Sequence, residues 1–186
     1  MTVKKTTFSL ALSAAVGLGL WAPAAQAFDG TITFNGTVSS QTCQINAGTG
    51  KDFAVDLPTV AASALESGTV AGLKNFHITL TGCAPAGKVR AYFPPSSSVD
   101  VTTYQLKNVL TSGAATGVQI QILDAETLLP IKVGADQGEQ DSPWFDIDTN
   151  GTADMKYLAG YIKEAGAASV QSGGVMANVN YTVEYE

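Results

Sequence analysis

The chain has 186 residues, in which 10 Lys and Arg face 16 Asp and Glu, for a formal charge of −6. This acidic balance disfavours nucleic-acid binding, which selects basic patches, and suits a solvent-exposed protein that must stay soluble. The length is ample for one hydrophobic core and short for two domains. The 19 glycines and the many Thr and Val residues favour short strands and turns over helices.

The first 27 residues are predicted to be a signal peptide. Lys4 and Lys5 form a basic start, an apolar stretch follows from residue 8 to about 21, and Ala25-Gln26-Ala27 has the pattern of a cleavage site. The apolar stretch is too short for a typical spanning helix, although an uncleaved anchor is the alternative. Cleavage after Ala27 would leave 186 − 27 = 159 residues, with 8 basic against 16 acidic side chains.

Alternation of apolar and polar residues predicts a series of short strands. The predicted strands are 30–38, 37–45, 51–57, 76–80, 89–93, 104–110, 118–122, 155–161 and 175–185. In the segment 118–122, Gln119 and Gln121 alternate with the apolar residues. A short helical turn is expected within 58–72, which is rich in Ala and Ser. Many short strands with Gly-rich turns predict an antiparallel sandwich.

The chain has two cysteines, Cys43 and Cys83. An even count in an exported protein suggests one disulfide in an oxidising compartment. The alternative is a metal or redox pair, but the 39 intervening residues, the lack of a C-x-x-C motif and the single histidine, His77, argue against it. The disulfide would close a loop that contributes about 4 kcal/mol to stability in the chain-entropy model.

No catalytic constellation is evident in the sequence. His77 lies on the polar face of a predicted strand, where it is interpreted as a surface residue without the partners that a general base needs. Residues 146–151 read D-x-D-x-N-G, the opening of a calcium loop, but Tyr157 stands where a bidentate Glu should be. We interpret this segment as an Asx-rich turn, with calcium binding as the alternative. The sequence therefore predicts no enzymatic activity, no cofactor and no metal.

The two ends of the mature chain are the most informative segments. Residues 30–38 (GTITFNGTV) and 175–186 (VMANVNYTVEYE) both alternate as strands do. A domain that begins with a free strand and ends on another can join to copies of itself, which points to polymer building. The alternative is that residues 30–38 are an ordinary first strand paired within their own domain.

In this arrangement the chain resembles the pilins of the chaperone–usher class, in particular the major subunit of type 1 fimbriae. The resemblance covers nearly the whole mature chain. It rests on the donor-like segment 30–38, the spacing of Cys43 and Cys83, the segments 76–83, 117–124 and 157–161, and Gly173 and Tyr185 near the C-terminus.

The resemblance implies an incomplete immunoglobulin-like sandwich that lacks its last strand and is completed by the donor strand of a neighbouring subunit. The implied divisions are a signal peptide (1–27), a donor-strand extension (28–38) and a pilin domain (39–186). The implied donor face is Gly30, Ile32, Phe34, Gly36 and Val38. The implied groove edge and chaperone-recognition residues are Gly173, Val175, Ala177, Val179, Tyr181, Val183 and Tyr185.

The implied function is that of a structural subunit of a bacterial surface fimbria that polymerises by donor-strand exchange and supports cell adhesion. The implied partners are other copies of the subunit, joined head to tail, a periplasmic chaperone and an outer-membrane usher. A minor adaptor or terminator pilin, or a tip adhesin of the same system, is the alternative function. A self-contained exported binding domain is a further alternative. The expected route is export through the periplasm to the cell surface.

Overall fold

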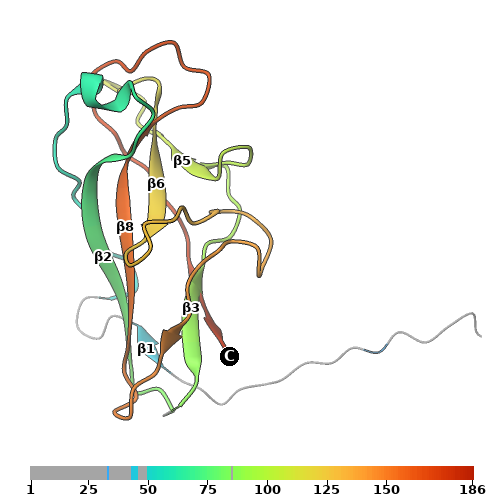
Figure 1. The fold of residues 1–186 in the computed structure, drawn as a ribbon. Helices are drawn as coiled ribbons and strands as arrows, with labels where there is room; N and C mark the ends of the chain where they lie inside the picture. Colours follow the sequence, from blue (N-terminus) through green and yellow to red (C-terminus); the bar gives the residue numbers. More distant parts are fainter. Residues whose placement is uncertain (1–32, 34–42, 46–49, 85) are drawn as a thin grey trace, which may run out of the picture. The chain divides into compact units, whose positions relative to one another are not determined.

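The computed structural model describes residues 33, 43–45, 50–84 and 86–186. All of these except Thr33 lie in one compact unit, Ser39–Glu186. Its larger sheet has the strand order β1 (Gln44–Ile45), β2 (Ala71–Thr81), β8 (Ala153–Lys163), β6 (Val118–Asp124), β5 (Gln105–Lys107) and β4 (Val99–Asp100). The smaller sheet has the order β7 (Phe145–Asp146), β3 (Lys88–Tyr92) and β9 (Thr182–Tyr185). Figure 1 shows both sheets.

Every strand pair in the two sheets is antiparallel. The one helical element among the described residues is a 3-10 turn, η1 (Ala62–Leu65), which confirms the helical turn predicted within 58–72. The prediction of an all-β antiparallel sandwich is therefore confirmed. No helix in the described part of the chain has the length and apolar character needed to cross a membrane.

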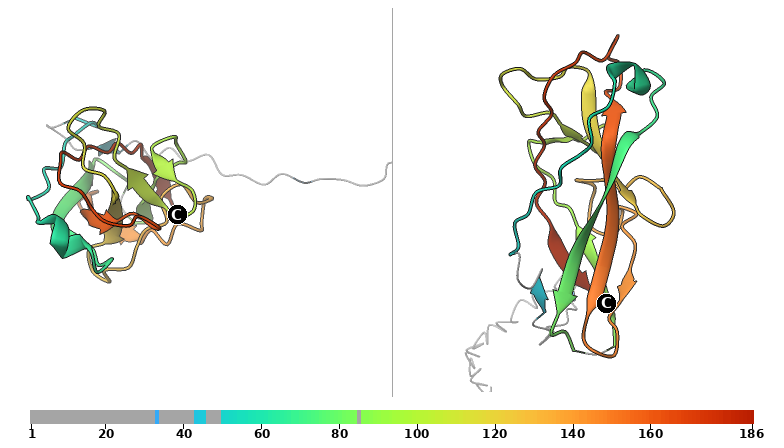
Figure 2. Two further views of the ribbon diagram at one scale, coloured as in Figure 1. Left: turned by 90° about the horizontal axis from the view of Figure 1, so that it is seen from above. Right: turned by 90° about the vertical axis from the view of Figure 1, so that its left-hand side faces the viewer.

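The long strands β2 and β8 run side by side along the unit (Figure 2). Their register places Phe76 opposite Tyr157 and Ile78 opposite Met155. The apolar residues of each strand recur at every second position, so one face of the pair points into the sandwich. Ile78, Met155 and Tyr157 are fully buried there.

Tyr157 lies at the centre of the core, between the two sheets. Its ring lies 5.6–5.8 Å from the rings of Phe76, Phe93 and Phe145. Its hydroxyl accepts a hydrogen bond from the backbone N–H of Ala91 at 3.2 Å and lies 3.2 Å from the hydroxyl of Ser142. A buried phenol needs such partners, because an unpaired polar group would be costly in the core. Tyr157 thereby ties β8 to the smaller sheet.

Three of the strands predicted from the sequence differ in the structure. Residues 51–57 form no strand, the predicted strand 104–110 is regular only over β5, and the predicted last strand is regular only over β9, so that 175–181 lie outside any strand. In addition, Gln119 and Gln121 are buried, although they alternate with the apolar residues of β6. The side chain of Gln121 donates hydrogen bonds to the carbonyl oxygens of Ile122 and Ile131, so the loop after β6 covers the outer face of that strand.

Candidate functional site

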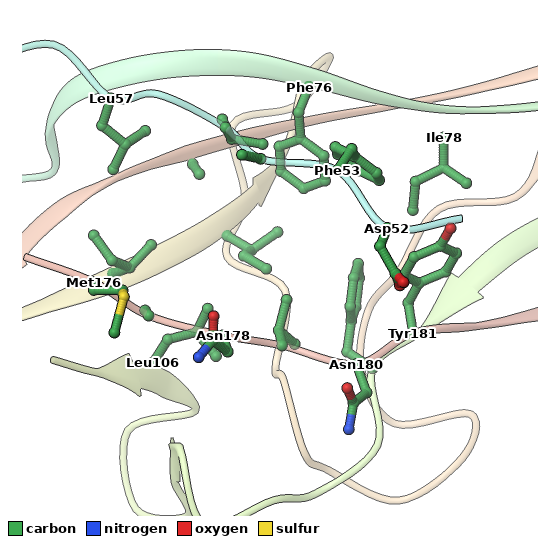
Figure 3. A pocket seen from close by; sticks show the side chains of 18 of the residues that line it. Asp52, Phe53, Leu57, Phe76, Ile78, Leu106, Met176, Asn178, Asn180 and Tyr181 are labelled. Carbon is green, nitrogen blue, oxygen red and sulfur yellow. The ribbon is translucent and has the colours of Figure 1, made fainter. Parts of the chain in front are cut away.

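An open groove of about 1080 Å³ lies between residues 51–57 and residues 175–181. These two segments, which we call the N-terminal rim and the C-terminal rim, run along the same side of the unit in Figure 2. The floor of the groove is the apolar interior of the sandwich, as Figure 3 shows in part. It includes Phe76, Ile78, Phe93, Leu106, Ile120, Ile122, Ala159 and Tyr161.

Backbone N–H and C=O groups along both rims lack sheet partners among the described residues. Within the described part of the chain, neither rim belongs to a sheet, and residues 177–180 make no backbone–backbone hydrogen bond with another described residue. Yet the C-terminal rim alternates as a strand does, since Val175, Ala177 and Val179 are partly buried and the residues between them are exposed. The geometry is that of a sandwich with an open slot for one more strand.

The C-terminal rim is held at both of its ends. At its end, β9 pairs with β3, where Val183 lies opposite Ala91. At its start, the side chain of Asn108 donates to the carbonyl oxygens of Ala115 and Gly174 and accepts hydrogen bonds from the N–H groups of Leu110 and Met176. The stretch between these two anchors is therefore kept extended beside the groove.

Gly173 lies at the first of these anchors. A Cβ atom at this position would meet the backbone nitrogen of Ala115 at 2.3 Å and the carbonyl carbon of Ala114 at 2.5 Å. Residues 174 and 113–115 exchange hydrogen bonds beside it, from Ala115 N–H to Gly174 O and from Gly174 N–H to Gly113 O. Only glycine allows this close approach of the two backbones.

The rims carry some charge around an apolar interior. Asp52 and Asp56 lie on the N-terminal rim and are exposed. The pKa of the Tyr181 hydroxyl is raised, first by burial and then by the negative charge of Asp52. Burial also raises the pKa of Tyr161 on the floor. The acidic side chains lie on the rim and the floor is apolar, so the groove favours an apolar ligand.

The structure separates the predicted groove-edge residues into three groups. Val175, Ala177, Val179 and Tyr181 line the groove, whereas Val183 and Tyr185 lie in β9 and pair with β3. Gly173 packs against residues 114–115 instead. The predicted donor face (Gly30, Ile32, Phe34, Gly36 and Val38) lies outside the described residues.

Sequence reasoning did not assign a role to the N-terminal rim or to the floor. Phe53, Val55 and Leu57 line the groove from the N-terminal rim, and their alternation in the sequence was the signal that could have placed them there. The floor residues could not be found in this way, because Leu106 and Ile120 come from separate strands that pair only in the folded chain.

The other sequence-predicted features are placed as follows. A disulfide joins Cys43 to Cys83, as predicted. The side chain of His77 is exposed, and its Nδ1 lies 3.0 Å from the Asp154 carboxylate. The Asx-rich turn is confirmed, since the Asp148 carboxylate accepts hydrogen bonds from the N–H groups of Asn150 and Thr152. Among the described residues, no cluster of three or more potential metal ligands occurs.

Comparison with known proteins gives this fold a class. The sandwich is similar to the crystal structure of the P pilus rod subunit PapA, with a TM-score of 0.58 at 21% identity over 77% of this chain and 99% of that chain. It is also similar to a chaperone–usher pilus structure solved to explain rod uncoiling, with a TM-score of 0.55 at 22% identity over 89% and 100% of the two chains. The fold is that of a pilus rod subunit.

Sequence comparison gives the family. The protein-family model described as type-1 fimbrial protein, A, matches residues 57–186 of this chain. The chain is 47% identical to the major fimbrial subunit SMF-1 of Stenotrophomonas maltophilia over 87% of its length and 95% of that protein. It is 38% identical to the F17 fimbrial protein of Escherichia coli over 99% and 100% of the two chains.

The chain belongs to the type-1 fimbrial protein family. It is a structural subunit of a surface fimbria of the chaperone–usher class, and not an enzyme. The resemblance drawn from the sequence alone is thereby confirmed.

Proposed function

We propose that the groove receives residues 28–38 of a neighbouring subunit as an added strand, so that copies of the chain join head to tail into the fimbria. The observation that carries this proposal is a pair of rims that, among the described residues, have no sheet partners and lie on either side of an apolar floor. An extended peptide that adds to a sheet edge gains main-chain hydrogen bonds, and its alternate side chains enter pockets.

The proposed donor segment suits this groove. Its alternation puts Ile32, Phe34 and Val38 on one face, and burial of three large apolar side chains supplies roughly 5–9 kcal/mol. Gly36 lies on the same face and has no side chain, so the two backbones can approach closely there. The contact uses different surfaces on the two copies and does not close on itself, so it builds an open filament.

The same groove accounts for a need for assembly factors. An apolar slot with free backbone groups is an aggregation hazard until it is filled. We infer that residues 1–27 direct export, that a periplasmic chaperone occupies the groove first, and that an outer-membrane usher then hands the subunit to the growing fibre at the cell surface. The finished fimbria supports cell adhesion.

The test of strand addition is a pair of charge substitutions in the donor segment. Phe34→Asp places a carboxylate on the face that enters the apolar groove, where burial of a charge costs several kcal/mol. Thr33→Asp places the same charge on the opposite face and is the matched control. Electron microscopy should find fibres on cells with Thr33→Asp and none with Phe34→Asp, while immunoblots find both subunits in the periplasm. Normal fibres with Phe34→Asp would refute the proposed donor.

A further inference from the structure

Side chains from the two rims meet across one end of the groove. The Tyr181 hydroxyl, from the C-terminal rim, donates a hydrogen bond to the Lys51 carbonyl oxygen of the N-terminal rim at 2.8 Å. The Phe53 ring lies 6.4 Å from the Tyr181 ring, centre to centre, and 6.3 Å from the ring of Phe76 on β2. Figure 3 shows Phe53 and Tyr181 approaching each other from the two rims.

This contact occupies the path of an added strand. A strand inserted between two others holds them about 9.5 Å apart, which is twice the usual spacing between strands. Its backbone would fill the space between the rims, and that is where the Tyr181 side chain reaches to bond directly to the main chain at Lys51. The direct bond and an inserted strand therefore exclude each other at this end.

Few interactions hold this contact between the rims closed. Phe53 is 40% exposed, so only its inner side is packed. That side faces Phe76, which in turn stacks on the buried Tyr157 at 5.6 Å. At the other end of the groove, among the described residues, no hydrogen bond joins residues 55–57 to residues 175–177. Closure is thus confined to one end and depends on one hydrogen bond and one pair of rings.

We propose that Phe53 and Tyr181 form a gate across the empty groove, which opens before an added strand can be fully seated and which slows the entry of that strand. This inference rests on the proposed function and adds to it a barrier to strand entry into the empty groove. The gate stabilises the empty groove and is absent from the filled one. Weakening it should therefore speed strand entry without weakening the complex, since a smaller share of the binding free energy goes into opening.

The experiment measures uptake of a fluorescent peptide of residues 28–40 by the mature chain, residues 28–186, with its disulfide intact. Stopped-flow anisotropy gives the association rate, and chase with unlabelled peptide gives the dissociation rate. Tyr181→Phe removes the hydroxyl and keeps the ring. Loss of one hydrogen bond of ordinary net strength shifts the equilibrium between the closed and open gate by about 2- to 10-fold. We expect Tyr181→Phe to raise the association rate by this factor, and Phe53→Ala by at least as much, with dissociation unchanged.

The controls separate a gate from other roles. Tyr104→Phe removes a hydroxyl from the turn between β4 and β5, outside the groove lining, and should leave both rates as in the wild type. A labelled peptide carrying Phe34→Asp should not bind. If Tyr181 instead held the bound strand, Tyr181→Phe would raise the dissociation rate, and that result overturns the gate.

Failure of the gate differs from failure of strand addition. Wild-type uptake with unchanged association rates in both Tyr181→Phe and Phe53→Ala would refute the gate and leave strand addition standing. A wild-type chain that stays monomeric in size-exclusion chromatography and still takes up no peptide would refute strand addition and the gate together. Each variant tests the gate independently, so loss of folding in one of them leaves the other decisive.

Discussion

Replacing Gly173 with alanine should destabilise the subunit by about 2–6 kcal/mol. The added Cβ would lie 2.3 Å from the backbone nitrogen of Ala115, so the two backbones must separate. Separation threatens the hydrogen bonds from Ala115 N–H to Gly174 O and from Gly174 N–H to Gly113 O, each with a net value of about 0.5–1.5 kcal/mol. Strain from overpacking adds about 1–3 kcal/mol.

Urea unfolding of the mature, oxidised subunit measures this cost, with circular dichroism as the signal. Gly113→Ala is the comparator, because a Cβ at Gly113 meets no neighbour and only the left-handed backbone (φ +64°) opposes it, at about 1–2 kcal/mol. A loss of stability for Gly173→Ala no larger than that for Gly113→Ala would refute the steric reasoning.

This result bears on the predicted role of Gly173 in chaperone recognition. The close approach to Ala114 and Ala115 gives Gly173 a role inside the subunit. A Gly173 variant that fails to bind a chaperone could therefore fail because its C-terminal rim is displaced. Recognition by the chaperone stays a prediction, and pull-down experiments on variants of matched stability test it.

Two further predictions concern the core and the covalent structure. Tyr157→Phe should cost about 1–3 kcal/mol in urea unfolding, because the N–H of Ala91 loses its buried partner. Burial raises the pKa of Tyr157, so the contribution of the neutral phenol to stability is fully present below about pH 10 and is lost as pH rises through the raised pKa. Tyr157→Phe should therefore lose less stability than the wild type between pH 9 and pH 11. Equal losses in the two proteins would contradict this. The mature chain should begin at Phe28, as its intact mass checks. Reduction of the disulfide, whose cysteines are 40 residues apart in the sequence, should lower stability by about 4 kcal/mol in urea unfolding under oxidised and reduced conditions. A mature chain whose thiols alkylate without reduction would contradict the disulfide.

The strands that the sequence predicted well are those whose alternation reflects burial on one face. β2, β3, β6 and β8 all contain predicted strand segments, because Ile78, Val89, Ile120 and Met155 point into a single core. The same signal does not account for Gln119 and Gln121, which alternate with the apolar residues yet are 2% and 3% exposed. Gln121 donates to the Ile131 carbonyl oxygen in the loop after β6, whereas Gln119 accepts from the Thr103 hydroxyl and donates to the Asp100 carboxylate. Local alternation within β6 carries no information about these contacts.

The rims show a second limit of the sequence pattern. Residues 51–57 and 175–181 alternate as strands do, yet neither is assigned to a sheet. Alternation records which side chains face an apolar surface, whereas a strand also needs a hydrogen-bonded neighbour. The two rims have the first property and, among the described residues, lack the second. The candidate site is therefore the place where the two criteria disagree.

The disulfide has a mechanical consequence for a fibre under tension. The proposed donor extension ends at residue 38, and Cys43 follows five residues later, covalently joined to Cys83 just beyond β2. A pull on the extension therefore reaches the end of β2 through a covalent bond and bypasses β1, which has only two residues. From there the load spreads over the rungs that pair β2 with β8, from Leu80 opposite Ala153 to Ala71 opposite Tyr161. Without the disulfide, the same pull would peel β1 away one rung at a time.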